Sequence, residues 1–474
     1  MRRRVSEEMT QDLVIETTPI PDLLVVRMPV HGDNRGWFKE NWQREKTIAA
    51  GLPDFGPVQH NVSFNNRAGA TRGIHAEPWE KLVSVVTGRI FGAWVDLREG
   101  DSFGTVFTLE MGPESAVFIP RGVGNAYQTL EDATTYSYLV NDHWSAQARE
   151  SYMFVNLADE ALAISWPLPL ETADISDADL SHPPLSDLTP FRPRKPRVLV
   201  LGDGGQLANA FREVLPDADY RTIDQYDLTD PQAPESVDWT QVDVIINAAA
   251  YTAVDHAETA EGRPLAWAVN ATGVARLASV AREHGITLVH YSTDYVFDGV
   301  REVHSEDERL SPLGVYAQSK AAGDIVVSTV PRHYVLRTSW LVGDGPNFVR
   351  TMAGLADRGI SPSVVDDQWG RLTFTEDLVA ATLHLLQGNA RHGVYNVSCE
   401  GEPQSWADIA ASVFTLRGRP ADDITRVSTE DYGAGKEMAP RPRYSTLDLK
   451  KVKGAGFSPR SARDALNEYV ERLP

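Results

Sequence analysis

The sequence is poor in cysteine and in long apolar runs. Cys399 is the single cysteine, so the chain can form neither an internal disulfide nor a thiolate metal cluster. A run of about 18 or more apolar residues, which a transmembrane helix requires, does not occur. The first residues, MRRRVSEEMTQDL, are basic like a signal peptide but lack its apolar region. These absences predict a soluble, cytoplasmic protein.

An excess of basic residues is also missing. The 474 residues include 45 Lys and Arg against 66 Asp and Glu, which gives a formal net charge of −21. Proteins that bind nucleic acids or anionic membranes need a basic surface. The composition therefore argues against both partners. It still allows a small anionic substrate, because a few local arginines are enough to hold one.

The first part of the chain, residues 14–166, is predicted to be β-structure. Short apolar runs such as LLVVRMPV, KLVSVV and SAVFIP alternate with turn residues such as TGR and GPE. Strands at about 8–12-residue spacing are typical of a sandwich or barrel. The stretch WQREKTIAAG alone looks helical. Residues 167–196 then carry seven prolines, which excludes a helix or a central strand there.

From Arg197 onward, strand and helix patterns alternate. RVLVLG, VDVIINAAA and ITLVHYST read as buried strands, while QLANAFREVL and the long stretch GRPLAWAVNATGVARLASVAREHG read as helices. This alternation predicts a doubly wound α/β domain with a parallel sheet of the Rossmann type. We expect a β-domain at 1–188, a proline-rich linker at 189–196, and an α/β domain at 197–474 with a smaller C-terminal part.

A glycine-rich turn follows the first α/β strand. Glycines there permit a tight turn and the close approach of a pyrophosphate to the helix N-terminus. An acid about 20 residues further on would bind the adenosine ribose, and Asp224 and Asp227 compete for this role. Such an acid leaves NADH as plausible as NADPH. The predicted cofactor contacts in this region are Gly202, Gly204, Gly205, Gln206, Leu207, Asp224, Asp227 and Leu228.

A stronger signal lies at Thr293 and in the stretch YAQSK. Thr293 ends a strand, and Tyr316 and Lys320 lie four residues apart, on one face of a predicted helix. The lysine cation would lower the pKa of the tyrosine and hold the nicotinamide ribose. Tyr316 could then give a proton to a carbonyl oxygen while a nicotinamide gives hydride to its carbon.

Residues 197 to nearly the C-terminus resemble the short-chain dehydrogenase superfamily, specifically the dTDP-4-dehydrorhamnose reductases. The matching stretches include INAAAYTAVDHAE, VHYSTDYVFDG, SPLGVYAQSKAAGD and RPRYSTLD. The resemblance implies NADPH or NADH as cofactor. It implies that Thr293, Tyr316 and Lys320 are catalytic, that Ala248, Ala249 and Tyr251 line the cofactor, and that Trp340 and Arg441 lie near a nucleotide sugar.

The first half poses the question of His75, in the stretch ATRGIHAEPWEKLV. A metal-binding cupin would need further ligands, but the second candidate stretch, IPRGVGNAYQ, offers Asn125, a poor transition-metal ligand. His75 and Glu77 alone are too few ligands to hold a metal. The alternative is metal-free acid–base chemistry, and we expect no bound metal.

Residues from about 18 into ISDADLSHPPLSDL resemble the dTDP-4-dehydrorhamnose 3,5-epimerases, which have a cupin-like jelly-roll fold. The resemblance implies that His75 is a base oriented by Asp159, that Tyr138 is the acid on the opposite face, and that no cofactor is needed. It implies that Lys81 and Arg72 stabilise an enolate oxygen or a diphosphate. Arg35, Glu40, Gln59 and Asn61 match nucleotide-sugar contacts. Asn125, the HAEP stretch and Leu139 depart from the family pattern.

Together the two resemblances predict a bifunctional enzyme. A 4-keto-6-deoxy nucleotide sugar, dTDP-4-keto-6-deoxy-D-glucose, would be epimerised at C5 and C3 and then reduced at C4 to dTDP-L-rhamnose or a close relative. By analogy with the epimerases we expect a homodimer formed through the β-domain. Two alternatives remain open at this stage. The β-domain could be a non-catalytic binding module, or the α/β half could be a regulatory subunit.

Overall fold

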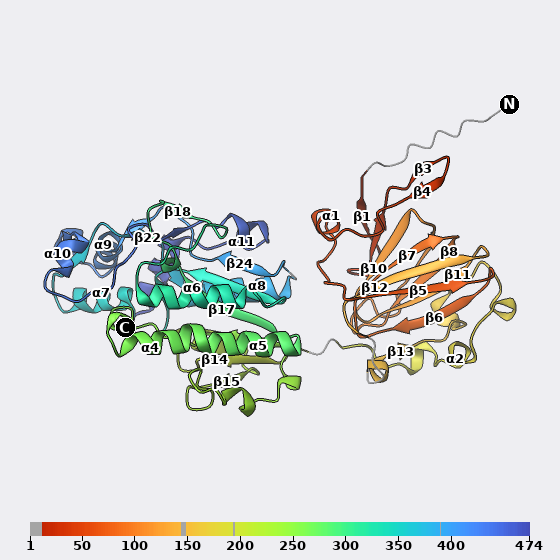
Figure 1. The fold of residues 1–474 in the computed structure, drawn as a ribbon, viewed down its shortest axis with the longest axis horizontal. Helices are drawn as coiled ribbons and strands as arrows, with labels where there is room; N and C mark the ends of the chain where they lie inside the picture. The colour runs from red at the N-terminus through yellow and green to blue at the C-terminus, as the bar shows by residue number, and fades with distance from the viewer. Residues whose placement is uncertain (1–11, 144–147, 193–194, 389) are drawn as a thin grey trace. The chain divides into compact units, whose positions relative to one another are not determined.

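The computed structural model describes residues 12–143, 148–192, 195–388 and 390–474. The chain forms two compact units, Met1–Lys195 and Pro196–Pro474 (Figure 1). The predicted linker at 189–196 is in part bound to the first unit. The Phe191 backbone N–H donates to the carbonyl of Leu97 at 2.6 Å, and the Phe191 carbonyl accepts from the Glu99 N–H at 2.9 Å.

The first unit is a sandwich of two antiparallel sheets, as predicted for a jelly roll. One sheet has the order β1 (Val14–Thr17), β2 (Leu24–Arg27), β10 (Ser115–Ile119), β7 (Lys81–Thr87), β12 (Thr134–Val140) and β5 (Gln59–Asn65). The other has the order β13 (Met153–Phe154), β6 (Thr71–Ala76), β11 (Val123–Thr129), β8 (Ile90–Asp96) and β9 (Val106–Met111).

The inner faces of the two sheets form a hydrophobic core. Val83 and Val117 come from the first sheet, and Trp94 and Tyr127 from the second, and all four are buried in one cluster. Side chains alternate between the two faces of a strand, so every second residue points into the sandwich. This alternation places residues of β7 and β12 opposite residues of β6 and β11.

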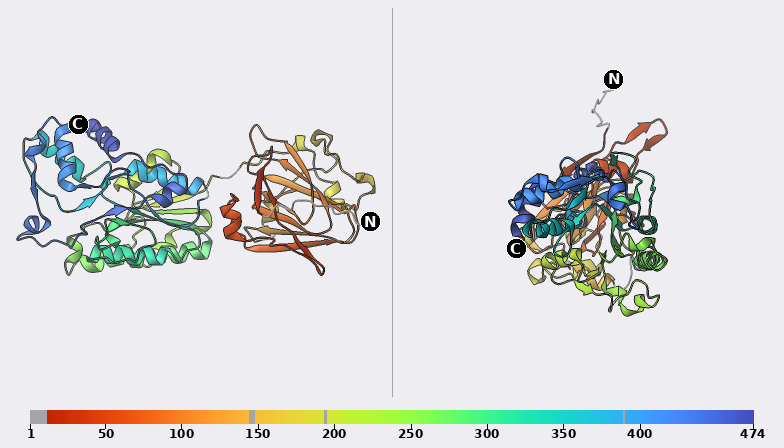
Figure 2. Two further views of the ribbon diagram at one scale, coloured as in Figure 1. Left: turned by 90° about the horizontal axis from the view of Figure 1, so that it is seen from above. Right: turned by 90° about the vertical axis from the view of Figure 1, so that its left-hand side faces the viewer.

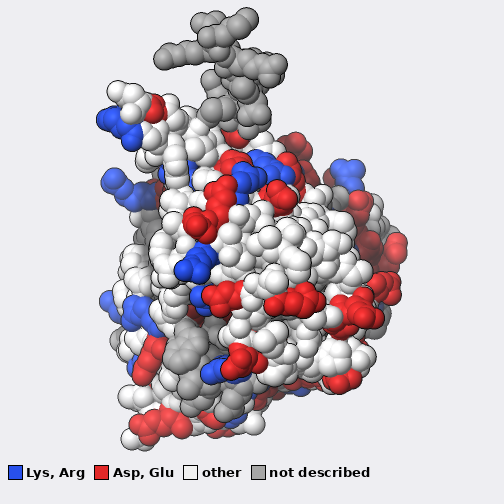
Figure 3. All heavy atoms as spheres, turned by 90° about the vertical axis from the view of Figure 1, so that its right-hand side faces the viewer, with Lys and Arg blue, Asp and Glu red and all other residues white. Residues whose placement is uncertain are grey.

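A separate hairpin projects from this unit (Figure 1). Its strands are β3 (His31–Asp33) and β4 (Gly36–Phe38), and it exposes Trp37 and 68% of Phe38. The predicted helix follows as α1 (Arg44–Ala49), capped by the Gln43 side chain. On the face shown in Figure 3, basic side chains lie scattered among acidic ones around an uncharged area, in keeping with the negative net charge.

The proline-rich segment contains one α-helical turn that was not predicted, besides 3-10 turns at Leu170–Thr172 and Leu185–Asp187. Helix α2 (Asp177–Leu180) begins after Ser176, whose hydroxyl accepts a hydrogen bond from the backbone N–H of Asp179. The prediction that residues 167–196 exclude a helix was therefore wrong for this turn. The nearest following proline is Pro183, beyond the end of the helix, where it removes no helical hydrogen bond.

The second unit contains a parallel sheet of six strands, which confirms the predicted doubly wound class. Its order is β15 (Asp219–Arg221), β14 (Val198–Leu201), β16 (Val244–Asn247), β17 (Thr287–Thr293), β19 (His333–Thr338) and β24 (Gly393–Asn396). The chain leaves β14 toward β15 and later returns on the other side of β14 to form β16. A crevice is expected at the carboxyl ends of strands where the direction reverses in this way.

Helices cover both faces of this sheet (Figure 2). One face carries α3 (Gln206–Val214) and α8 (Thr375–Gln387); the other carries α4 (Gly262–Trp267), α5 (Val274–His284) and α6 (Val315–Val327). The long helix predicted at 262–285 is interrupted by a π-helical segment, Ala268–Gly273. A Cβ on Gly273 would lie 2.5 Å from the carbonyl oxygen of Leu228, so the segment brings this glycine into close contact with the chain after β15.

A smaller C-terminal part packs around its own core. Its helices are α7 (Phe348–Asp357), α9 (Trp406–Leu416), α10 (Thr429–Gly433) and α12 (Ala462–Arg472). Helix α11 (Lys450–Gly454) instead packs its Val452 into the core of the six-stranded sheet. The α/β unit also contains four short strand pairs: β18 (Val303–His304) with β27 (Thr446–Leu447), β20 (Leu341–Val342) with β23 (Thr373–Phe374), β21 (Ser363–Val365) with β26 (Thr425–Val427), and β22 (Trp369–Gly370) with β25 (Gln404–Ser405). Among the described residues, no helix has both the length and the apolar character needed to cross a membrane.

Candidate active sites

The β-domain brings His75 together with a carboxylate. His75 lies on β6, and its Nε2 atom is 2.7 Å from Oδ1 of Asp179 in α2. An imidazole that donates through Nε2–H keeps Nδ1 unprotonated and able to accept a proton. Burial acts to raise the pKa of Asp179, but the hydrogen bond and charge of His75 outweigh burial and hold this pKa below its ordinary value.

The predicted partner of His75 was therefore wrong. Asp159 caps a 3-10 turn: Oδ1 accepts from the backbone N–H of Ala161 at 2.9 Å, and Oδ2 accepts from that of Leu185 at 2.6 Å. The residue missed by the sequence reasoning is Asp179. A local signal was available, because Ser176 followed three residues later by an acid is a helix-start pattern.

A second histidine lies beside this pair. His182 Nε2 is 3.9 Å from Asp179 Oδ1, and the rings of His75 and His182 meet edge to face with centroids 5.5 Å apart. His75, Asp179 and His182 offer three potential ligand atoms within 4.8 Å of one another. The sequence had supplied only His75 and Glu77 as ligands. The expectation of no metal thus remains an expectation.

Tyr138 and Lys81 come from the opposite sheet. Tyr138 lies on β12 and Lys81 begins β7, with the Lys81 ammonium 5.4 Å from the centroid of the Tyr138 ring. Burial raises the pKa of Tyr138, and Tyr127 adds to this effect while Arg72 opposes it. Burial also lowers the pKa of Lys81, to about 7. The arrangement places a phenol and a cation across the sandwich from the sheet that carries His75.

Asn125 adjoins the same region. Asn125 lies on β11 and pairs in register with His75 on the neighbouring strand β6. Its Nδ2 atom donates to the Tyr136 hydroxyl at 3.2 Å. Asn125 is thus held by a phenol.

The four predicted nucleotide-sugar residues separate into two pairs. Asn61 on β5 pairs in register with Tyr138. The Gln59 side-chain amide donates to Oδ1 of Asn61 at 3.0 Å, so Gln59 and Asn61 both lie on the face of the sheet that carries Tyr138. Arg35 is 85% exposed and pairs with Asp33, while Glu40 pairs with Lys46. Within the part of the chain that the structure describes, Arg35 and Glu40 do not contact His75, Tyr138 or Lys81, and their role as nucleotide-sugar contacts stays a prediction.

In the α/β unit, the glycine turn has the shape that a dinucleotide needs. Gly202 has φ +92°, and a Cβ there would lie 2.7 Å from the backbone nitrogen of Ala249. Gly204 has φ +85° and faces open space. Helix α3 begins next, after Gly205, which has no side chain to cap the first N–H groups. These groups therefore stay available to an anion such as a pyrophosphate.

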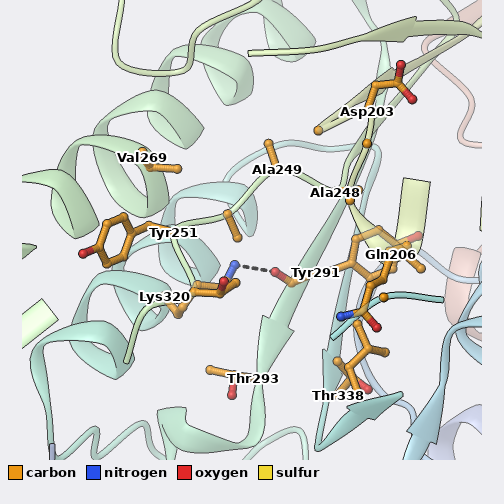
Figure 4. A pocket seen from close by; sticks show the side chains of 18 of the residues that line it. Asp203, Gln206, Ala248, Ala249, Tyr251, Val269, Tyr291, Thr293, Lys320 and Thr338 are labelled. Carbon is orange, nitrogen blue, oxygen red and sulfur yellow. Dashed lines mark hydrogen bonds between the residues drawn. The ribbon is translucent and has the colours of Figure 1, made fainter. Parts of the chain in front are cut away.

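A cleft of about 790 Å³ lies at the carboxyl ends of the parallel strands (Figure 4). Most of the predicted cofactor and catalytic residues line it: Gly202, Gly204, Gly205, Gln206, Leu207, Asp227, Leu228, Ala248, Ala249, Tyr251, Thr293, Tyr316, Lys320 and Trp340. Its shape and the open helix end fit a dinucleotide.

Asp224 does not line the cleft, whereas Asp227 does. Asp224 is exposed in the turn after β15. Asp227 is held in place because its Oδ1 atom accepts from the Thr229 backbone N–H at 2.7 Å and from the Thr229 hydroxyl at 2.8 Å. Of the two candidates left open by the sequence, the structure favours Asp227, and Asp224 as a cofactor contact stays a prediction.

Thr293, Tyr316 and Lys320 meet at one end of the cleft. Lys320 donates to the carbonyl of Tyr291 at 2.5 Å, shown as the dashed line in Figure 4. Burial lowers the pKa of Lys320 to about 8, with Asp324 opposing. Burial, followed by the charge of Asp294, raises the pKa of Tyr316 above its ordinary value. The expected lowering by Lys320 is not found, because removal of the phenol from water dominates.

A buried carboxylate that the sequence reasoning missed adjoins this set. The Thr293 hydroxyl donates to Asp294 Oδ1 at 2.8 Å. Burial raises the pKa of Asp294 to about 7, against the hydrogen bonds from Thr293 and Ser445. Asp294 follows Thr293 directly in the stretch STDY, so its position was visible in the sequence, but its burial was not.

The two residues expected near a nucleotide sugar lie in different surroundings. Trp340 lines the cleft and stacks on Trp406 with ring centroids 3.8 Å apart, which joins the cleft to the C-terminal part. Arg441 does not line the cleft; it pairs with Asp255 at 2.9 Å. It reaches the site through Tyr295, whose ring meets that of Tyr316 edge to face at 6.4 Å.

Comparisons with known proteins agree with this division. Residues 17–187 match the family described as dTDP-4-dehydrorhamnose 3,5-epimerase, and residues 196–474 match the family described as RmlD substrate binding domain. A protein of Streptococcus pyogenes serotype M6, named Protein RmlC homolog, is 48% identical over 184 residues, which are 38% of this chain and 92% of that protein.

For the second half, a dTDP-4-dehydrorhamnose reductase of Mycobacterium tuberculosis H37Rv is 39% identical over 288 residues, 58% of this chain and 92% of that protein. The solved structure of dTDP-4-dehydrorhamnose reductase from Bacillus anthracis, in complex with NADP, superimposes with a TM-score of 0.54 and 33% identity, covering 58% of this chain and 99% of that one. The chain therefore belongs to the RmlD substrate binding domain family through residues 196–474, and it carries a dTDP-4-dehydrorhamnose 3,5-epimerase domain at residues 17–187 in the same polypeptide.

Proposed function

We propose that the chain is a bifunctional enzyme of dTDP-L-rhamnose synthesis, or of a close relative of this sugar, and that it acts in the cytoplasm. The β-domain epimerises dTDP-4-keto-6-deoxy-D-glucose at C5 and C3. The α/β domain then reduces the C4 ketone with NADPH or NADH. The observation that carries the proposal is the His75–Asp179 pair facing Tyr138 in one unit, together with Thr293, Tyr316 and Lys320 in a dinucleotide-shaped cleft in the other.

Epimerisation follows from the two faces of the sandwich. A proton next to a ketone is acidic because the carbanion becomes an enolate. His75 Nδ1 removes this proton, while Asp179 holds the ring and stabilises its positive charge. Lys81 stabilises the enolate oxygen, and Tyr138 gives a proton to the opposite face of the carbon. One C–H bond breaks and another forms, and His75 and Tyr138 then exchange protons with solvent.

Reduction needs a hydride for C4, which a bound nicotinamide dinucleotide supplies. Residues of the chain itself supply the proton that the C4 oxygen needs. The Tyr316 hydroxyl gives its proton to the C4 oxygen, so that the ketone becomes an alcohol. Thr293 positions this oxygen, and the Lys320 cation stabilises the tyrosinate that remains. The raised pKa of Tyr316 keeps the phenol protonated and ready to act as the acid.

The order of the two reactions is set by chemistry. The C4 ketone must be present to acidify the protons at C5 and C3, so epimerisation precedes reduction. Reduction removes the ketone and with it the route back. A shared chain raises the local concentration of the intermediate at the second site only if the linker allows the two sites to approach each other.

Two further features belong to the proposal. The cofactor is NADPH or NADH, since the reductase relative from Bacillus anthracis was solved with NADP and Asp227 remains available for a ribose hydroxyl. The protein forms a homodimer through the β-domain. Supporting this are the exposed apolar side chains of the hairpin and of the outer face of β5: Trp37, Phe38, Val62 and Phe64. Such a contact would also carry Arg35 toward a second copy.

The experiment that tests the function supplies dTDP-4-keto-6-deoxy-D-glucose with NADPH or NADH and identifies the product by NMR. The expected product has inverted C3 and C5 and a C4 hydroxyl. A parallel reaction in deuterated solvent without cofactor tests the β-domain alone. Deuterium at C5 supports epimerisation, whereas its absence combined with reduction of pre-epimerised sugar would favour a non-catalytic β-domain. Absence of cofactor oxidation would favour a regulatory α/β half.

A further inference from the structure

Glu77 contacts Lys81 inside the β-domain. Glu77 follows strand β6 directly, two residues after His75, and its carboxylate forms an ion pair with the Lys81 ammonium at the start of β7. Both side chains are buried, with 11% of Glu77 and 7% of Lys81 exposed. A buried charge needs a partner, and removal of one member leaves the other uncompensated. A neutral glutamine at this position could not supply this charge.

We infer that Glu77 is a positioning residue of the epimerisation site, whose carboxylate keeps Lys81 in the ammonium form and aimed at the reacting ketone oxygen. The inference rests on the proposed epimerase function. It goes beyond that function because it assigns a role to Glu77, a residue that the proposed proton transfers do not use. Glu77 acts through Lys81 and is not itself assigned a contact with the sugar.

The other elements around Lys81 do not replace this counter-ion. Strand β10, which pairs with β7, has the sequence SAVFI and offers no titratable side chain. Strand β12 contributes the phenols of Tyr138 and Tyr136, and across the sandwich Arg72 adds a like charge. Among the described residues, Glu77 is the carboxylate that pairs with Lys81.

The neighbouring acid, Glu80, is directed elsewhere. Its Oε2 atom accepts from Asn141 Nδ2 at 2.8 Å, and its backbone N–H donates to Asn141 Oδ1 at 2.9 Å. Glu77 and Glu80 therefore lie three residues apart in the same turn but hold different partners. This difference makes Glu80 a matched control for Glu77.

The protonation of Lys81 decides how well it stabilises an enolate. An ammonium interacts with a developing oxyanion as a charged donor, while a neutral amine offers a much weaker hydrogen bond. Burial lowers the pKa of Lys81 to about 7. A carboxylate in contact favours the charged form and moves this pKa upward. The value of about 7 holds with Glu77 in contact. Loss of the carboxylate leaves burial unopposed, so Lys81 would then lose its proton at a lower pH than in the unmodified protein.

The test compares the pH dependence of solvent deuterium incorporation at C5, without nicotinamide cofactor, from about pH 5 to 9. In the unmodified protein we expect the rate to fall above about pH 7, where Lys81 loses its proton. In Glu77→Gln the same fall, roughly tenfold per pH unit for one titrating group, should begin about one pH unit lower. Glu77→Asp should restore the profile of the unmodified protein, and Glu80→Gln should keep it.

The double variant Glu77→Gln/Lys81→Arg gives a second readout, because arginine stays charged without a counter-ion. Its profile should lack the fall that Lys81 produces on the alkaline side, whatever its absolute rate. A rate for Glu77→Gln that drops equally at every pH would show a merely structural role and overturn the inference. If the unmodified protein incorporates no deuterium at any pH, the proposed epimerase function itself is wrong. Exchange by the unmodified protein with a profile identical to that of Glu77→Gln overturns the inference alone.

Discussion

The imidazole of His75 and the carboxylate of Asp179 are hydrogen-bonded at 2.7 Å, although 104 positions separate them in the chain. The bond assigns a direction to the ring: Nε2 faces Asp179, and Nδ1 is left as the proton acceptor. Asp159, which the family pattern had suggested for this role, instead stabilises the chain after β13 by accepting two backbone hydrogen bonds.

Asp179→Asn and Asp159→Asn separate the two assignments. We expect Asp179→Asn to slow C5 deuterium exchange by roughly 10²- to 10⁴-fold, because the ring loses its orienting anion. Asp159→Asn should leave exchange within a few-fold of normal and lower the stability by about 1 kcal/mol through a weakened cap. NMR exchange rates and thermal melts measure both effects. The reverse ranking of the exchange rates would restore Asp159 as the orienting acid.

His75→Ala and Tyr316→Phe test whether the two activities are separate. His75→Ala should abolish C5 exchange and retain reduction of pre-epimerised substrate, because Tyr316 lies in the other compact unit. Tyr316→Phe should lose about 10²–10⁴-fold in reduction, the usual contribution of a general acid, and keep exchange. The absorbance of the reduced nicotinamide cofactor follows the reduction, and NMR follows the exchange. Persistent C5 exchange in His75→Ala would remove His75 as the base.

The pKa of Lys320 predicts how the rate of reduction falls on the alkaline side of its pH profile. Burial lowers its pKa to about 8, so the group is charged below that pH and neutral above it. Because the cation stabilises the tyrosinate left after proton transfer, kcat/KM should fall as the pH rises through about 8. Lys320→Arg, which stays charged, should remove this fall even if the rate is lower. A fall at the same pH in Lys320→Arg would assign the titration to another group.

Gly202 and Gly204 form a matched pair for cofactor binding. Both have positive φ, but only at Gly202 would a Cβ collide with backbone, 2.7 Å from the nitrogen of Ala249. Gly202→Ala should therefore weaken NADPH binding by more than tenfold. Gly204→Ala carries the backbone strain alone, about 1–2 kcal/mol. Titration of NADPH fluorescence measures both affinities. Equal losses would show that strain, not close approach, decides binding.

Chelation tests the metal-free reading of the β-domain. His75, Asp179 and His182 could together bind a divalent ion, yet the His75–Asp179 contact has the length of a hydrogen bond. We expect C5 exchange to be unchanged after treatment with EDTA. His182→Ala should likewise keep most of the exchange rate. Loss of activity on chelation, with recovery on addition of Zn²⁺, would make these three residues a metal site.

Several features were decided by the sequence alone because they are local. Gly202 and Gly204 between a strand and a helix need no distant partner to form their turn. The four-residue spacing of Tyr316 and Lys320 brings both to one face of α6 by helical geometry alone. The alternation of short strands in one half, and of strands and helices in the other, was enough to predict both fold classes, since hydrophobic periodicity is set residue by residue.

The tertiary structure decided everything that depends on distant partners. It selected Asp179 over Asp159 as the partner of His75, and it favoured Asp227 over Asp224. It also showed that Glu77 faces Lys81, which spacing could not reveal because the two residues lie in a strand end and a turn rather than in one helix. Protonation also depends on the tertiary structure. The pKa of Tyr316 is raised and that of Lys81 is lowered because the fold removes both groups from water. The sequence alone does not show which side chains are buried.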